Sequence, residues 1–235
     1  MMVFSNSCGQ CKVRDQALCG VLSDIELAPL AACGVQRKLA RGETLVRAGD
    51  SAPVCANIQR GLMKISHINP AGQEVIVGLL WPGDFVGTPF RTEQPALHDV
   101  VALSPVSLCV FPQRHMERAL IENPSMERAL LSRTLAELEM ARTHCSKLAR
   151  ATALARVAGF IVESARRTER DGETVTTIEL PLSRSEMADL LGLTIETVSR
   201  QMTRLKSAGV IGLPGGRHVV IHDPDALAEA AEELN

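Results

Sequence analysis

Residues 183–211 hold the pattern that most restricts the fold of this 235-residue chain: SRSEMADLLGLTIETVSRQMTRLKSAGVI. Ser183 and Glu186 form a capping box, in which a hydroxyl and a carboxylate three residues apart satisfy the free amides at a helix start. Gly192 can adopt the left-handed conformation that ends this helix, and Thr194 is suited to cap a second one. The pattern therefore predicts two short helices joined by a tight turn, a helix-turn-helix.

The second of these helices carries three polar residues on one face near its N-terminus. Glu196, Ser199 and Arg200 stand at positions i, i+3 and i+4, so their side chains project to the same side. In a helix-turn-helix these positions reach base edges in the major groove, where Arg pairs with guanine and Glu accepts from cytosine. A solvent-facing Glu–Arg pair is the alternative that fits the same spacing. The turn before this helix and the hairpin after it favour contacts with DNA bases.

A predicted β-hairpin follows the second helix. In residues 210–221 two β-branched runs flank a Pro-Gly-Gly turn and would form a wing beside the helix. Arg204, Lys206 and Arg217 are predicted to contact DNA phosphates, which set the orientation of a protein on the duplex without reading its sequence. Solvated surface positions remain the alternative for these three cations. Together these features indicate a winged helix-turn-helix that binds double-stranded DNA.

Between residues 35 and 111 the chain changes to short β-like stretches separated by Gly and Pro. Strands of this length at intervals of about 8–12 residues are typical of an all-β roll or sandwich. Several glycines stand where a turn would need a left-handed backbone or a close approach. These are Gly42, Gly49, Gly61, Gly72 and Gly83.

Pro124 opens a long helical stretch that extends towards residue 165. Six of its residues follow alternating four- and three-residue steps and form a coiled-coil-like seam: Leu131, Leu135, Leu138, Arg142, Cys145 and Ala149. A helix packed on its own domain is the alternative for this pattern. The length exceeds the diameter of one domain, which favours a two-helix dimer spine. We expect the helix to break near residues 150–152.

Three of the seven cysteines lie close together near the N-terminus, in CGQCKVRDQALC. The C-x2-C-x7-C spacing of Cys8, Cys11 and Cys19 lets one metal centre bind all three if a fourth ligand comes from elsewhere. A structural zinc ion and an iron–sulfur cluster both accept thiolate ligands, so the residues leave the metal open. Three further cysteines lie in apolar stretches and are expected to be small core residues: Cys33, Cys55 and Cys145.

The composition and the absence of certain patterns indicate which classes of protein this chain can belong to. Hydrophobic residues make up 46% and charged residues 22% of the chain, which is a globular profile. The longest apolar run, residues 75–81, is far shorter than the ~20 residues of a membrane-spanning helix. No signal-peptide pattern precedes Cys8, so we expect a cytoplasmic location, where thiols stay reduced. No nucleophile, base and orienting group occur as a recognisable set, so we do not expect an enzyme.

With its elements in this order, the chain resembles the CRP/FNR family of bacterial transcription regulators over nearly its whole length. The stretch LGLTIETVSR at 191–200 is similar to the recognition signature of the FNR branch, whose E-x-x-S-R residues fall on Glu196, Ser199 and Arg200. The resemblance implies an α+β fold whose β-roll is a jelly roll like that of cyclic-nucleotide-binding domains. It also implies a cysteine-rich arm, the β-roll sensor, a dimerisation helix and the DNA-binding domain, at residues 1–24, 25–118, 119–152 and 153–235.

The resemblance further implies partners and a cofactor. Proteins of the FNR branch bind palindromes with TTGAT-type half-sites as homodimers, and RNA polymerase is the expected further partner. They hold an oxygen-labile 4Fe–4S cluster on three N-terminal cysteines and one from the β-roll. The matching positions are Cys8, Cys11, Cys19 and Cys109. This implies an oxygen sensor that binds DNA under anaerobic conditions.

Other signals and chemistries remain as alternatives. Cyclic-nucleotide members of the family carry a Gly-Glu-Leu cassette followed by Arg-Ser, whereas Thr88 stands at the Glu position here and no Arg-Ser follows in residues 95–99. Without the Arg fork we expect no cyclic nucleotide. A CRP-type regulator of haem-borne nitric oxide or carbon monoxide would leave the thiols incidental. A β-roll metalloenzyme with His67, Glu74 and His98 is a further interpretation.

Overall fold

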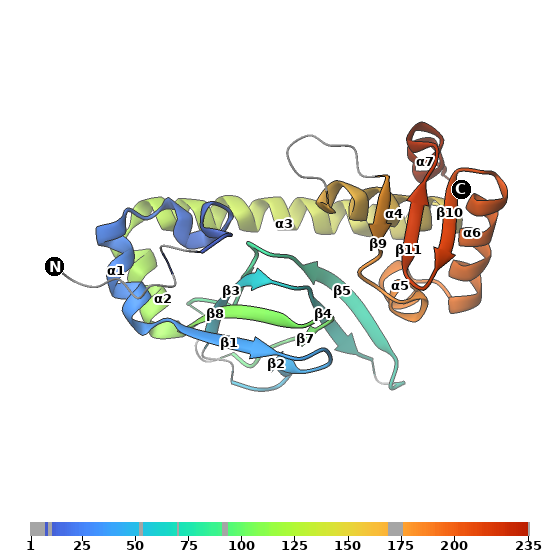
Figure 1. Cartoon of the computed structure of the whole chain (residues 1–235). Coiled ribbons are helices and arrows are strands. Elements are labelled where there is room, and N and C mark those ends of the chain that lie inside the picture. The colour runs from blue at the N-terminus through green and yellow to red at the C-terminus, as the bar shows by residue number, and fades with distance from the viewer. Residues whose placement is uncertain are drawn as a thin grey trace. The chain divides into compact units, whose positions relative to one another are not determined.

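The computed structural model describes residues 8, 11–51, 54–69, 71–90, 94–168 and 176–234, so most of the first ten residues of the predicted arm lie outside it. The chain divides into two compact units, residues 1–138 and 139–235. The long helix α3 (Pro124–Arg150) belongs partly to each. The predicted α+β fold, with a β-roll, a long helix and a winged helix-turn-helix, is confirmed (Figure 1).

The first unit is built around two four-stranded antiparallel sheets, with strand orders β1-β8-β3-β6 and β2-β7-β4-β5. Its strands are β1 (Val35–Leu39), β2 (Thr44–Val46), β3 (Val54–Arg60), β4 (Met63–Ile68), β5 (Glu74–Leu80), β6 (Phe85–Val86), β7 (Asp99–Ala102) and β8 (Val106–Pro112). Its helical elements are the 3-10 turns η1 (Arg14–Gln16) and η2 (Leu18–Val21) and the helices α1 (Asp24–Cys33) and α2 (Gln113–Glu122). All five predicted turn glycines have positive φ angles.

Strands β3 and β8 separate two apolar cores. Ala56 and Ile58 on β3 and Leu108 on β8 face the interior of the roll, where the two sheets pack together. Cys55 and Phe111 face the opposite side, where they pack against α1, α2 and the η turns. Because side chains alternate along a strand, one sheet serves both cores. The second core lies where the N-terminal segment meets the roll.

Helix α2 and the short strands β1 and β6 were not among the predicted elements. Helix α2 follows Pro112, whose side chain cannot accept a capping hydrogen bond, so its start carries no sequence signal. Strand β1 exposes four of its five residues and therefore lacks the alternation of a half-buried strand. The capping box of α1 at Ser23 and Glu26 has the form its sequence predicts.

The second unit contains the end of α3 and the predicted helix-turn-helix. Its further elements are α4 (Ala153–Thr168), β9 (Thr177–Glu179), α5 (Arg184–Leu191), α6 (Ile195–Ser207), β10 (Ile211–Gly215), β11 (His218–Ile221) and α7 (Pro224–Ala231). Gly192 has a φ angle of 62° after α5, and the Thr194 hydroxyl accepts from the Thr197 amide at 3.2 Å to cap α6. These local predictions are confirmed.

Two predictions in this unit need correction. Gly215 pairs with His218, so the turn of the wing lies at Gly216 and Arg217 and Gly215 belongs to β10. The sequence Glu179-Leu180-Pro181-Leu182 also predicts a short strand, but strand β9 ends at Glu179, because it pairs with β11 over Thr177–Glu179.

The predicted break after α3 falls at Ala151 and Thr152, without Gly or Pro. The Thr152 hydroxyl accepts from the amide of Ala155 at 3.1 Å and so begins α4. The Arg156 guanidinium donates to the carbonyls of Leu148, Ala151 and Leu191 at 2.8, 3.1 and 3.1 Å. A cation at helix C-termini satisfies carbonyls that have no helical partner. Arg156 thus joins the end of α3, the start of α4 and the end of α5.

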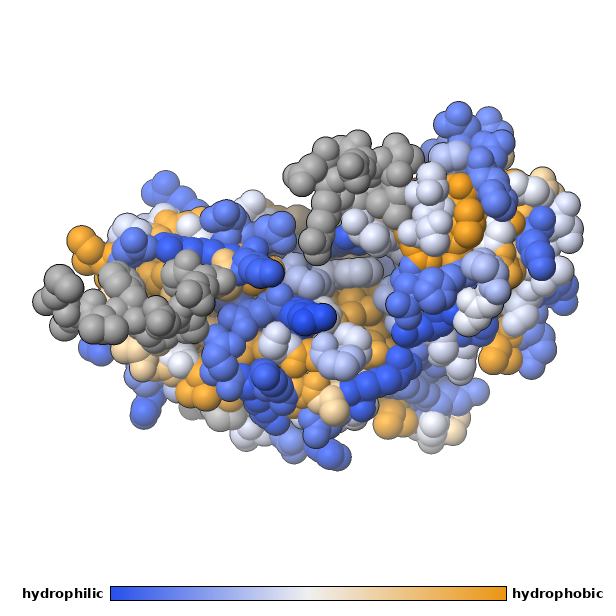
Figure 2. Space-filling view, in the orientation of Figure 1, coloured by the Kyte–Doolittle hydropathy of each residue, from blue (hydrophilic) through white to orange (hydrophobic). Residues whose placement is uncertain are grey.

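Hydrophilic side chains cover most of the face drawn in Figure 2, and apolar residues show in separate areas between them. In the described segments, no helix combines the length and the apolar character needed to cross a bilayer.

Replacing Arg156 tests this junction. Arg156→Met keeps an apolar stem but leaves three carbonyls without their charged donor, so we expect unfolding to become easier by about 2–4 kcal/mol. Thermal and urea unfolding followed by circular dichroism measure this change. Arg166→Met on α4 is the matched control, because its guanidinium is exposed and 3.9 Å from Glu163. Equal losses in the two variants would contradict the role of Arg156.

Candidate metal centre and nucleic-acid interface

The N-terminal arm, defined here by the described residues 8 and 11–22, is held on the β-roll by its apolar side chains. Backbone hydrogen bonds fold it into successive turns, including Ala17 to Val13 at 2.8 Å and Leu22 to Cys19 at 3.2 Å. Val13, Ala17, Leu18 and Leu22 are buried, and Leu18 and Leu22 belong to the core formed with α1 and α2. The arm is therefore a packed part of the first unit from residue 11 onward.

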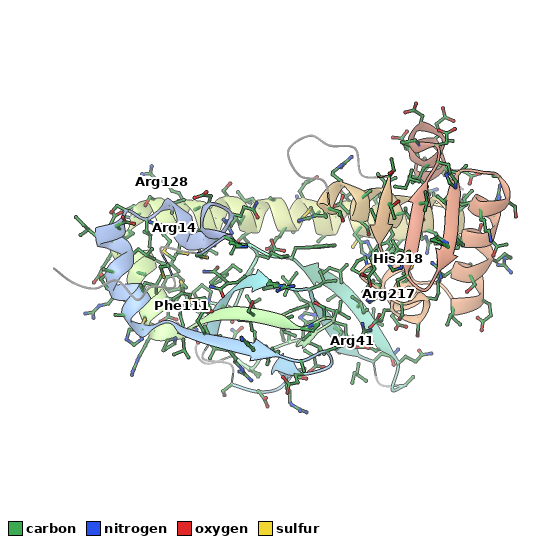
Figure 3. All side chains as sticks on the ribbon, in the orientation of Figure 1. Arg14, Arg41, Phe111, Arg128, Arg217 and His218 are labelled. Carbon is green, nitrogen blue, oxygen red and sulfur yellow. The ribbon has the colours of Figure 1, made fainter. Side chains whose placement is uncertain are left out.

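Four thiols line one cavity between the arm and the roll: Cys8, Cys11, Cys19 and Cys109. Most of its wall surface is apolar. Arg14 on the arm and Phe111 on β8 also border it (Figure 3). The structure thus brings together the three arm cysteines and the roll cysteine singled out from the sequence.

Burial controls the protonation of two of these thiols. Desolvation, with smaller contributions from the neighbouring thiols of Cys11 and Cys8, raises the pKa of Cys19 to about 11. Desolvation likewise raises the pKa of Cys109 to about 12, with added contributions from Cys8, Cys19 and Cys11. Both thiols are therefore neutral at pH 7. A bound metal cation would reverse this preference, because only the thiolate is a metal ligand.

Three polar side chains at the cavity were not predicted. The Asn57 amide nitrogen lies 3.8 Å from the sulfur of Cys19, and the Gln59 amide nitrogen lies 4.0 Å from the sulfur of Cys11. Arg14 forms an ion pair with Asp24 at 2.6 Å. This hydrogen bond raises the pKa of Arg14, and Cys19 lies near enough to raise it further. No local sequence pattern identifies these residues, and only their positions in the fold reveal them.

Arg133 on α3 connects the arm to the roll and to the long helix. Its guanidinium donates to the carbonyls of Gln16 at 2.5 Å and of Gly83 at 3.2 Å. Gly83 has a φ angle of 95°, and a Cβ there would lie 2.9 Å from the Cβ of Gln16. The arm can approach this turn only because residue 83 is glycine. Figure 1 shows the arm, in blue, beside the first half of α3.

The described residues contain no three His, Cys, Asp or Glu side chains arranged to hold a single metal ion. The interpretation of His67, Glu74 and His98 as a metal site fails on this ground. The two imidazole rings lie edge to face with centroids 6.3 Å apart, and Glu74 is paired with Lys64 at 2.6 Å.

The three cysteines expected in the core differ from one another. Cys55 is fully buried, which confirms its prediction, and Cys33 is partly buried close to Cys109. Cys145 is exposed in the single chain, so its assignment to the core of its own chain was wrong. All six side chains of the predicted dimer seam on α3 are exposed in the single chain: Leu131, Leu135, Leu138, Arg142, Cys145 and Ala149.

The outer face of α6 carries the predicted base-contacting residues. Glu196, Ser199 and Arg200 are exposed, while the opposite face buries Val198, Met202 and Leu205. The Arg200 guanidinium donates to the Thr197 hydroxyl at 3.3 Å. Backbone hydrogen bonding at Glu196 and the Thr194 hydroxyl lower the pKa of the Glu196 carboxyl, so it is ionised at neutral pH.

The three predicted phosphate contacts have different surroundings. Arg204 and Lys206 are exposed near the end of α6. Arg217, at the start of β11 in Figure 3, donates to the carboxylate of Glu179 at 2.6 Å and to the carbonyl of Pro181 at 3.2 Å. A phosphate at Arg217 would compete with the Glu179 carboxylate.

Comparison with known proteins adds two family matches and a set of relatives. Residues 36–123 match the cyclic nucleotide-binding domain, and residues 155–230 match the Crp-like helix-turn-helix domain. A probable transcriptional activator of Rhizobium leguminosarum bv. viciae is 40% identical, covering 94% of this chain and 91% of that protein. The transcriptional activator protein FnrL of Cereibacter sphaeroides is 38% identical, covering 95% and 91%.

Among solved structures, FixK2 from Bradyrhizobium japonicum is similar with a TM-score of 0.75 and 27% identity, covering 84% of this chain and 96% of that one. The relatives in these comparisons are transcriptional activators and not enzymes. The prediction that the chain is not an enzyme is therefore confirmed, and the metalloenzyme interpretation is wrong.

The raised pKa values predict slow thiol chemistry in the cavity. After chelation of any metal, Cys19 should alkylate about a hundredfold more slowly at pH 8 than a thiol with the ordinary pKa near 9, because far less of it is thiolate. Its rate should rise with pH until about pH 11. Iodoacetamide labelling read by mass spectrometry measures each site, with the same cysteines in denatured protein as the reference. Equally fast labelling of Cys19 and Cys109 in folded and denatured protein would contradict the burial.

Proposed function

Because the chain belongs to the CRP/FNR family of transcription regulators, we propose that it is a homodimeric, oxygen-responsive transcriptional activator with a 4Fe–4S cluster. The cluster ligands in this proposal are Cys8, Cys11, Cys19 and Cys109. The observation that carries it is the meeting of these four thiols in one apolar cavity. When bound, the cluster would supply an oxygen-labile centre, and the chain's own residues would do the rest.

The arrangement of the thiols supports an iron–sulfur cluster over a zinc ion in this proposal. Four sulfurs around zinc would lie only about 3.8 Å apart, given Zn–S bonds of about 2.3 Å. No three candidate ligands in the described part of the chain are arranged around a single ion, although four thiols share one cavity. A group of several iron and sulfide ions suits a wider set of thiolates. The apolar walls would limit solvent access, one of the factors that set the stability of such a centre.

The arm would transmit the state of the centre through Arg133. This side chain binds the carbonyl of Gln16, three residues before Cys19, and sits on α3. Of the 27 residues of α3, all described, only Met126 is buried. A helix that leaves this much of its surface uncovered requires a partner for stability, which supports a dimer through the seam at Leu131, Leu135 and Leu138.

The dimer would present two copies of α6 to DNA. Glu196, Ser199 and Arg200 would read bases in a TTGAT-type half-site, while Arg204 and Lys206 would bind phosphates. Two-fold symmetry of the protein then requires a palindrome. RNA polymerase is the expected partner of an activator bound at a promoter. Because its target is the bacterial chromosome, we place the protein in the cytoplasm.

Removal of Cys109 tests the ligand set. Anaerobically prepared wild-type protein should be brown, with about four iron and four sulfide ions per chain. Cys109→Ser should lose most of the iron, the sulfide and the visible absorption, because a hydroxyl replaces the one thiolate that the roll supplies. Cys145→Ser is the matched control, since Cys145 does not line the cavity, and it should load normally.

Three results would count against the proposal. A colourless anaerobic protein that contains zinc would replace the cluster by a structural site. A Soret band after haem addition, with DNA binding unaffected by Cys8→Ala, would indicate a haem-based signal. Equal loading of Cys109→Ser and wild type would remove Cys109 from the site.

A substitution on α6 tests base reading. Arg200→Ala should cost roughly 1–3 kcal/mol on the intact palindrome and relax the choice at one guanine, because a bidentate contact is lost. Arg204→Ala should instead weaken specific and random DNA alike and lower the salt dependence. Anaerobic fluorescence anisotropy with single-base variants of the half-site measures both effects. Equal losses for Arg200→Ala on specific and random DNA would assign Arg200 to phosphate.

A further inference from the structure

Asn57 occupies an unusual place for an amide, in the middle of strand β3 at the cysteine cavity. It pairs in register with Cys109 on the neighbouring antiparallel strand β8. Directly opposite residues share one face of a sheet, with Cβ atoms about 4.5–5.5 Å apart. Asn57 therefore lies beside the roll cysteine and faces the arm that carries the other three thiols.

The surroundings of Asn57 provide few polar partners. The residue is 2% exposed, and its nitrogen donates to the sulfur of Cys19 at 3.8 Å. Its side-chain oxygen has no hydrogen-bond partner among the described residues. An amide buried in this way is unfavourable unless its hydrogen bonds are made. Among the described residues, its side-chain hydrogen bond is to a thiol of the candidate metal centre.

Gln59 repeats the arrangement two residues further along β3. The register of β3 against β8 shifts between Ile58 and Arg60, and both amides line the cavity of the four thiols. The Gln59 nitrogen donates to the sulfur of Cys11 at 4.0 Å. One strand thus directs two neutral N–H donors at two different arm cysteines.

We propose that Asn57 and Gln59 are positioning residues of the metal centre, whose N–H groups donate to the cysteine sulfurs of Cys19 and Cys11 when these are ligands. The inference rests on the proposed function and deepens it. A ligating thiolate can only accept, so each amide must turn its nitrogen towards the sulfur. Donation draws negative charge from the sulfur and stabilises the more negative, reduced form of a cluster, so it raises the reduction potential.

A neutral hydrogen-bond donor can be buried at position 57 at a lower cost in free energy than a charged one. A lysine or arginine at position 57 would place a cation on a strand that is buried in the core, at a large desolvation penalty. An amide supplies the donor without a net charge. The isosteric changes Asn57→Leu and Asn57→Asp therefore separate the donor from the shape, since Leu removes all polarity and Asp replaces the donor with an acceptor.

The experiment is an anaerobic redox titration of cluster-loaded protein, followed by absorption and electron paramagnetic resonance. Asn57→Leu and Asn57→Asp should have lower reduction potentials than wild type, with Asp the lower of the two. On transfer to air-saturated buffer, Asn57→Leu should lose its visible absorption about two- to tenfold faster, the factor that corresponds to one ordinary hydrogen bond. Gln59→Leu should shift in the same direction by less, because Gln59 is only partly buried.

Gln36→Leu is the matched control. Gln36 on β1 pairs with Cys109 from the other side of β8 but is exposed. Its replacement should leave the potential and the rate of cluster loss unchanged. Circular dichroism and melting of each metal-free variant separate effects on the centre from effects on folding.

The outcomes distinguish this inference from the function it rests on. A wild-type protein without iron and sulfide would end the proposed function before any variant is compared. Normal loading of wild type, with wild-type potential and rate of loss in Asn57→Leu, would overturn the inference alone. If Asn57→Leu does not fold, Gln59→Leu serves as the test variant. A reduction potential of Gln59→Leu equal to that of Gln36→Leu would overturn the role of the amides.

Discussion

The candidate centre depends on the apolar docking of the arm against the outer face of the β-roll. Leu18 and Leu22 enter the same core as Phe111 and Met116, and this packing places Cys19 opposite Cys109 across a cavity. The burial that brings these thiols together also disfavours their charged form, and the pKa values of Cys19 and Cys109 are raised as a result. Packing and protonation therefore act in opposite directions on metal binding, and a metal cation is the group that resolves the conflict.

The same docking connects the centre to the long helix. Arg133 bonds at once to the arm at Gln16 and to the roll at Gly83, so a shift of the arm changes two contacts of one α3 side chain. Met126 is the one residue of α3 that is fully buried, so the proposed pairing of two such helices would be sensitive to small changes. A bistable helix pair of this kind can convert local packing into a change of DNA affinity.

Local chemistry made most of the fold predictable. Capping boxes, turn glycines and the spacing of Cys8, Cys11 and Cys19 are properties of a few adjacent residues, and the structure has the expected caps and turns. Cys109 was identified only through a family resemblance, because its meeting with the arm spans about 90 residues. Asn57 could not be found in either way. Its role arises from the register of β3 against β8, which no short pattern encodes.

The residues that line the cavity supply little positive charge to balance thiolates. Arg14 is the one cationic side chain among the described residues that line it, and Asp24 already pairs with that guanidinium. The amides of Asn57 and Gln59 add dipoles but no net charge. Several thiolates would therefore depend on the metal itself for compensation, and loss of metal would favour protonation of the most buried thiols, Cys19 and Cys109. In the proposed centre, metal loss and proton uptake would thus be linked, and pH would affect the stability of the centre through these two cysteines.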